Sequence, residues 1–130
     1  MLKKKQINIT PDPYAPFHLS QGMSFGDLLF ISGQTSINEN GDLIHCGNFV
    51  AQAEQAFKNL DKILKNGGST LNDVLKVTIF LKNMSYFKEV VALREKYFSA
   101  PYPADSIVEI NRLFHPDALI EIEAIAVKAD

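Results

Sequence analysis

The chain has 130 residues, of which 46% are hydrophobic and 22% charged, and its formal net charge is −2. This length and composition predict a single globular domain over residues 1–130, with a core that needs no metal or disulfide staple. The one basic run, Lys3-Lys4-Lys5, is too short to indicate a nucleic-acid-binding protein. No apolar run reaches the roughly 20 residues that span a bilayer. The lysines are not followed by a signal-peptide core, so we expect no membrane partner and a cytoplasmic location.

The first half of the chain predicts three strands and one helix. Residues 5–9 are typical of a short strand, and the Pro-rich stretch after them is expected to be irregular. Gly26-Asp27 predicts a tight turn between strand residues 23–25 and 28–32, and Asn40-Gly41 marks a further turn. Apolar residues recur at three- and four-residue steps across residues 48–66, which predicts an amphipathic helix ended by Gly67-Gly68.

The second half predicts a strand over residues 74–81, a helix over residues 86–98 capped by Asn83 or Ser85, and two strands within residues 102–127. We expect one wholly apolar face on the first of these strands, made by Leu75, Val77, Ile79 and Leu81. One side of the helix is expected to carry Phe87, Val90, Val91, Arg94 and Phe98. Strands and helices are mixed along the chain, which predicts an α+β fold whose mixed sheet has both helices on one face.

The sheet face opposite the helices also carries large apolar residues. Alternation places Phe80 on that face of strand 74–81, and Ile125 and Val127 on that face of strand 120–127. Two helices cannot cover both faces of the sheet. We therefore expect other copies of the chain to cover this one.

Few patterns in the chain indicate a particular chemistry. The sequence has no hydrolase elbow, phosphate loop, dinucleotide fingerprint or zinc-ligand spacing. His18, His45 and His115 lie far apart in presumed loops, so we expect no metal site. The single cysteine, Cys46, follows His45 in a turn, which is not a nucleophile–base arrangement.

The last two strands hold acids in apolar surroundings. Asp105 opens one strand, and Glu121 and Glu123 lie in the other. Such acids are either solvated at an edge or held at a site.

Several motifs occur together in a fixed order: Leu28-Leu29-Phe30-Ile31-Ser32-Gly33-Gln34, Asn66-Gly67-Gly68-Ser69, Asp73-Val74-Leu75-Lys76-Val77-Thr78-Ile79-Phe80-Leu81, Tyr102-Pro103-Ala104 and Ile120-Glu121-Ile122-Glu123-Ala124-Ile125-Ala126-Val127. In this order and spacing they resemble the RidA/YjgF family, over about Gly22 to Lys128. The resemblance implies a chorismate-mutase-like fold and a homotrimer whose sheets pack inward into a barrel, with clefts for small molecules between subunits. It also implies hydrolysis of reactive enamines and imines of 2-amino acids, with no metal or organic cofactor.

The resemblance also implies roles for single residues. Glu121 matches the glutamate that positions or activates water. Ser32 and Gly33 match residues that line the cleft, and Phe17 matches an aromatic residue that is a tyrosine in the family. The loop after Phe17 is longer here than in the family.

The main departure from the family is Asp105, which occupies the position of an arginine that grips the substrate carboxylate. Ser106 and Ile107 match residues that contribute backbone groups, and Ile107 stands where many members have cysteine. An aspartate at about 4 Å would repel a carboxylate by about 4 kcal/mol at an effective dielectric near 20. Arg94 is a candidate substitute cation, whereas Arg112 is expected to be a surface residue.

Three functions remain open at this point. One is a deaminase-type hydrolase with altered substrate preference, in which Glu121 holds the attacking water. Another is a non-catalytic trimer in which Asp105 and Glu121 form an acidic pocket for an amine or a cation. The third is an endoribonuclease or translation inhibitor, against which the charge balance and the lack of a basic, aromatic-rich stripe argue.

Overall fold

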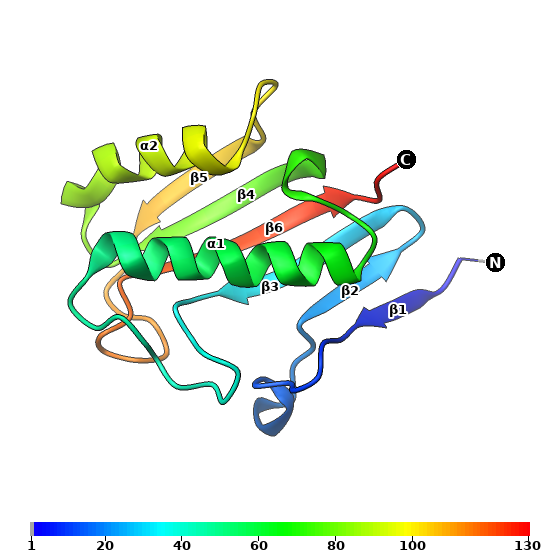
Figure 1. Ribbon diagram of the computed structural model, residues 1–130, viewed down its shortest axis with the longest axis horizontal. Coiled ribbons are helices and arrows are strands. Elements are labelled where there is room, and N and C mark those ends of the chain that lie inside the picture. Colours follow the sequence, from blue (N-terminus) through cyan, green and yellow to red (C-terminus); the bar gives the residue numbers. More distant parts are fainter. Residues whose placement is uncertain (1) are drawn as a thin grey trace.

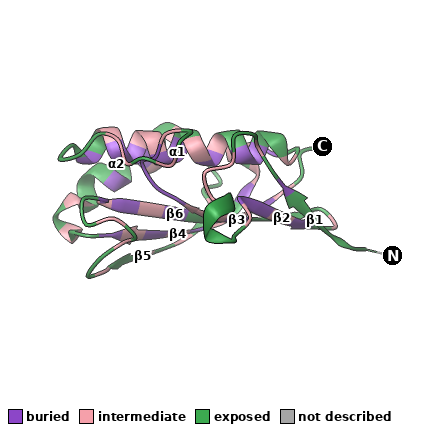
Figure 2. Ribbon diagram, turned by 90° about the horizontal axis from the view of Figure 1, so that it is seen from below, coloured by how far each residue is buried: buried purple, intermediate pink, exposed green. Residues whose placement is uncertain are grey.

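The computed structural model describes residues 2–130 and consists of a six-stranded sheet with both helices packed on one face (Figures 1 and 2). The strands are β1 (Lys4–Ile7), β2 (Gly22–Phe25), β3 (Leu28–Gln34), β4 (Val74–Leu81), β5 (Ala104–Glu109) and β6 (Ile120–Val127). The helices are α1 (Phe49–Asn66) and α2 (Phe87–Tyr97). The strand order is β1-β2-β3-β6-β4-β5, and in the described part of the chain β4 and β5 are the one parallel pair. The predicted α+β class and one-sided helices are confirmed.

Helix α1 lies across the middle of the sheet and supplies much of the core. It begins after Asn48, whose side chain accepts a hydrogen bond from the Ala51 amide at 3.0 Å, as expected of an N-cap. It ends at Gly67, whose amide donates to the Ile63 carbonyl. A Cβ atom at Gly67 would lie 2.5 Å from Leu29 Cδ2, so the glycine lets the end of the helix approach β3. These contacts fix α1 over β3 and β6.

Strand β4 differs from its predicted apolar face at its first residues. Val77, Ile79 and Leu81 are buried beneath the helices, as predicted. Leu75 was predicted to join them but is 48% exposed, and Val74 is buried instead. The cause is an irregularity in the pairing of β4 with β6 between Val74 and Lys76, which reverses the alternation there.

Helix α2 also differs from its predicted apolar side. Val90 and Phe98 are buried as predicted, together with Leu93, which the sequence pattern did not single out. Phe87 and Val91 are 42% and 46% exposed, so the side of the helix that carries them is only partly packed against the rest of the chain. The helix begins at Phe87, after a 3-10 turn over Met84–Tyr86 that Asn83 caps through the Ser85 amide.

The sheet face away from the helices, here called the open face, has no covering layer from residues 2–130 (Figure 2). Register and alternation place on it Phe25, Leu28, Phe30, Phe80, Val108, Ile125 and Val127. Four of these side chains are exposed: Phe25, Leu28, Phe30 and Val108. The exposed fraction is 47% for Phe25 and 46% for Phe30. A run of exposed aromatic and aliphatic side chains is typical of a protein–protein contact surface. Within residues 2–130, no helix has the length and apolar character that crossing a membrane requires.

Candidate functional site

Glu121 lies on the open face of β6, level with Phe80 of β4. Its neighbours in sequence, Ile120 and Ile122, point to the other face and are buried in the core, so alternation fixes the direction of the carboxylate. The pairing of β3 with β6 is irregular between Ile31 and Gln34, beside this carboxylate. Glu121 is therefore a half-buried acid at a break in the sheet.

Gly33, in that irregular part of β3, gives the carboxylate its room. A Cβ atom on Gly33 would lie 2.6 Å from both Cδ and Oε2 of Glu121, closer than any real contact. The close approach therefore requires glycine. Gly33 and Glu121, which the resemblance singled out separately, lie against each other within one chain.

Tyr14 supplies a hydroxyl group at the same place. Its hydroxyl donates to the Gly33 carbonyl at 2.9 Å. Burial, followed by the nearby charge of Glu121, raises the pKa of Tyr14 to about 12. The backbone amide of Tyr14 donates to Asp12 Oδ1, which also accepts from Gln21 Nε2, both at 2.9 Å. This network holds Tyr14 as a neutral phenol beside the carboxylate.

The pKa of Glu121 itself is raised, mainly by burial and secondarily by the charge of Glu123. A raised pKa brings a carboxyl closer to neutrality, where it can both accept and donate a proton. The site thus combines the acid–base carboxyl group of Glu121, the hydroxyl group of Tyr14 and the space that Gly33 leaves beside the carboxyl group.

Ser32 and Phe17 occupy less direct places. The Ser32 hydroxyl donates to the Ser20 carbonyl at 2.6 Å, which braces the strand against the preceding loop. Phe17 is 71% exposed at the end of a 3-10 turn over Ala15–Phe17. The tyrosine that reaches Gly33 is Tyr14, which the sequence reasoning missed. Its signal was Pro13-Tyr14, a second proline–aromatic pair just before Pro16-Phe17.

Asp105 is not a free carboxylate. Arg94 of α2 donates to it in bidentate fashion, from Nε to Oδ2 and from Nη2 to Oδ1, both at 2.9 Å. The pair is largely buried, with side-chain exposures of 23% for Arg94 and 18% for Asp105. It lines a surface pocket of about 390 Å³ together with Val91 and Tyr102. Asp105, expected to face the substrate as an acid, and Arg94, the candidate substitute cation, therefore neutralise each other.

Within one chain, Asp105 and Glu121 do not lie together. Asp105 pairs with Val77, on the helix-covered face, whereas Glu121 pairs with Phe80, on the open face. They are separated by two inter-strand spacings and three residues along the strands, so their Cα atoms lie roughly 14 Å apart. No acidic pocket made of both exists inside a single chain.

The remaining candidates lie apart from Glu121. Ser106 is on the open face, where its Oγ bonds Lys76 Nζ at 2.7 Å, and Ile107 is half-buried on the helix side. Arg112 is exposed and donates to the Leu113 carbonyl. His45 and Cys46 are exposed in the loop before α1. Across residues 2–130 no three His, Cys, Asp or Glu side chains gather as a metal site would require.

Comparison with known proteins gives consistent matches over almost the whole chain. The family model described as endoribonuclease L-PSP matches residues 9–128. A RutC family protein of Pyrococcus horikoshii is 42% identical over 118 residues, which is 91% of each chain. The 2-iminobutanoate/2-iminopropanoate deaminase of Mus musculus is 34% identical over 125 residues, 96% of this chain and 92% of that protein. The crystal structure of RidA from the Antarctic bacterium Psychrobacter superposes with a TM-score of 0.86 at 32% identity, covering 95% of this chain and 98% of that chain.

Proposed function

Because the chain belongs to the RidA/YjgF family, we propose that it is a hydrolase that deaminates small enamines or imines at Glu121. The observation that carries the proposal is the half-buried carboxylate of Glu121, with its raised pKa, in the gap left by Gly33. The mouse relative at 34% identity is named for deamination of 2-iminobutanoate and 2-iminopropanoate.

The chemistry needs one proton-transferring group and a water molecule. Glu121 takes a proton from water as the water oxygen bonds to the imine carbon, and it returns that proton to the nitrogen. The resulting carbinolamine passes its hydroxyl proton to the nitrogen and loses ammonia, as the C–N bond breaks and the C=O bond forms. An enamine first gains a proton on carbon and loses one from nitrogen, which makes it the imine. Tyr14, a neutral phenol, donates a hydrogen bond to the Gly33 carbonyl and so keeps Gly33 in place beside Glu121.

A second copy of the chain completes the site in this proposal. Glu121 lies on the apolar open face and the Arg94–Asp105 pair lies beside β5, an edge strand. One small substrate cannot touch two groups roughly 14 Å apart on opposite sheet faces. A homotrimer whose sheets pack inward brings Glu121 of one chain toward the β5 edge of the next, with the cleft between them. The exposed apolar side chains of the open face support this assembly.

The Arg94–Asp105 pair sets the proposed substrate preference. Two of the five N–H donors of Arg94 are hydrogen-bonded to Asp105, and the pair has no net charge. It therefore attracts a substrate carboxylate less than an unpaired arginine would. The preferred substrates are imines or enamines whose far end is uncharged, with 2-imino acids as slower ones.

The direct test is ammonia release from 2-iminopropanoate and 2-iminobutanoate generated in the assay by an amino-acid oxidase. Wild type is expected to release ammonia faster than buffer, and Glu121→Gln to lose at least about 100-fold of that rate. Glu89→Gln, which changes an exposed acid of α2 on the other side of the sheet, is the matched control and is expected to keep the activity. Equal rates for wild type and Glu121→Gln would refute a catalytic Glu121.

A non-catalytic binding protein is the second candidate, and the neutralised Arg94 is the observation that favours it. In that case wild type releases no ammonia from any imine. Ligands with an uncharged end would still raise its melting temperature. The description endoribonuclease L-PSP belongs to the family model, but the net charge of −2 makes RNA the weaker candidate substrate.

A further inference from the structure

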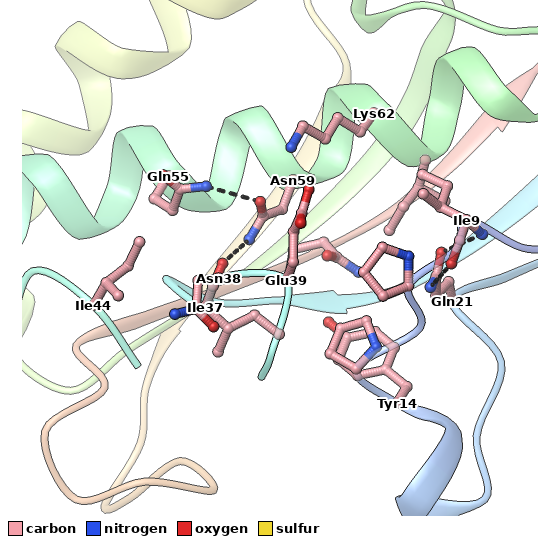
Figure 3. A pocket seen from close by; sticks show the side chains of 14 residues that line it. Ile9, Tyr14, Gln21, Ile37, Asn38, Glu39, Ile44, Gln55, Asn59 and Lys62 are labelled. Atoms are coloured by element: carbon pink, nitrogen blue, oxygen red, sulfur yellow. Dashed lines mark hydrogen bonds between the residues drawn. The ribbon is translucent and has the colours of Figure 1, made fainter. Parts of the chain in front are cut away.

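We propose that a cavity between α1 and the loops at the end of β3 binds a free α-amino acid with an aliphatic side chain. The cavity has a volume of about 310 Å³, within the range of small-molecule sites. Gln55, Asn59 and Lys62 of α1 form one wall (Figure 3). The other walls come from residues on either side of β2 and β3, including Tyr14 and Ile37.

The cavity is separate from the site at Glu121. Neither Glu121 nor Gly33 lines it. Tyr14 touches both places, with its ring in the cavity wall and its hydroxyl on the Gly33 carbonyl. A ligand held here would therefore not occupy the space beside the catalytic carboxylate.

The amide groups in the cavity wall are already used within the chain. Asn59 Nδ2 donates to the carbonyls of Thr35 and Ile37, both at 3.0 Å, and Asn59 Oδ1 accepts from Gln55 Nε2 at 2.9 Å. The Gln21 amide bonds both backbone groups of Ile9 at 3.0 Å. These bonds fix the wall and leave it few free polar groups. What the wall offers a ligand is mainly the apolar surface of Ile9, Ile37, Ile44 and Ile63.

Two opposite charges remain at this cavity. Lys62 comes from α1, and Glu39 comes from the turn that Asn38 ties through the amides of Asn40 and Asp42. In Figure 3 the Glu39 side chain extends toward the helix that carries Lys62. Among residues 2–130, neither side chain forms an ion pair within 4.0 Å. An ammonium, a carboxylate and an apolar floor match the three parts of an aliphatic amino acid.

The test is titration calorimetry of the full chain with L-leucine, which needs no turnover and so stands apart from the proposed deaminase activity. Saturable binding is expected, weakened about tenfold or more in Lys62→Ala and in Glu39→Gln. Lys58→Ala, an exposed lysine of α1 outside the cavity, is the matched control and is expected to bind as wild type does. Glu121→Gln is also expected to bind normally, which separates this cavity from the catalytic site.

Two analogues test the charge assignment. Leucinamide lacks the carboxylate and 4-methyl-2-oxopentanoate lacks the ammonium, so each is expected to bind about tenfold more weakly than leucine. Equal binding of the keto acid, with no effect of Glu39→Gln, would overturn the assignment of an amino acid. No saturable heat with leucine, or equal affinity in both cavity variants, would overturn the site itself.

Discussion

At the scale of single residues, the site depends on a few close contacts around one carboxylate. Glu121 and Gly33 can be predicted from the sequence through the motifs that resemble the RidA/YjgF family, whereas alternation alone gives only the sheet face of Glu121. Tyr14 could not be assigned with the same ease, since the path of a Pro-rich loop decides which aromatic reaches Gly33. The ion pair between Asp105 and Arg94 could not be predicted from the sequence either, because it depends on how α2 lies over β5.

Gly33→Ala tests the glycine gap. The new methyl group would occupy the place of the Glu121 carboxyl, from which its carbon would lie 2.6 Å. Since the displaced group is the end of a flexible side chain, we expect the free energy of unfolding to change by less than about 1 kcal/mol. The deaminase rate is expected to fall by about 100-fold or more. Ammonia release and urea unfolding measure the two effects, and an unchanged rate would contradict the assigned geometry.

At the scale of elements, the periodicity of the chain predicts which strands and helices form, but not every inward side chain. The irregularity in β4 places Val74 inside and Leu75 outside, and simple alternation cannot foresee it. Helix α2 turns Leu93 inward with Val90, which lies three residues earlier on the same side of the helix. The same placement of α2 brings Arg94 to Asp105 on β5.

Asp105→Asn tests what this contact between α2 and β5 does. Removing the carboxylate charge leaves Arg94 in place but no longer neutralised. We expect kcat/KM for 2-iminopropanoate to rise by about tenfold or more, from one charge-assisted contact of roughly 1.5–3 kcal/mol. Glu95→Gln is the matched control, since Glu95 lines the same pocket without bonding Arg94. A lower or equal kcat/KM in Asp105→Asn would exclude the proposed role in substrate preference.

At the scale of the whole molecule, the open face exposes apolar side chains that the fold of one chain does not bury. Phe25, Leu28 and Phe30 lie exposed on adjoining strands, where they contribute no buried apolar surface to the single domain. Sequence alternation already indicated apolar residues on both faces of the sheet. What it could not specify was how neighbouring chains are arranged, because that depends on the shape of the whole face.

Phe30→Glu tests the open face as the subunit interface. Light scattering after gel filtration is expected to give the mass of three chains for wild type and of one chain for the variant, because a buried unpaired carboxylate opposes association. Val50→Glu on α1 is the control, because Val50 is 45% exposed and Phe30 is 46% exposed. A Phe30→Glu protein with the mass of wild type would place the interface elsewhere.

The most direct test of the proposed catalytic site between subunits is subunit mixing. Glu121→Gln lacks the proton-transferring carboxyl group, and Arg94→Ala leaves the charge of Asp105 to repel the substrate carboxylate, so each variant is expected to be nearly inactive alone toward 2-iminopropanoate. They are unfolded together in equal amounts, refolded and assayed for ammonia. If each cleft takes Glu121 from one chain and Arg94 from its neighbour, about one quarter of the clefts regain both native residues and activity rises to about that fraction of wild type. A mixture no more active than its two components would contradict the shared site.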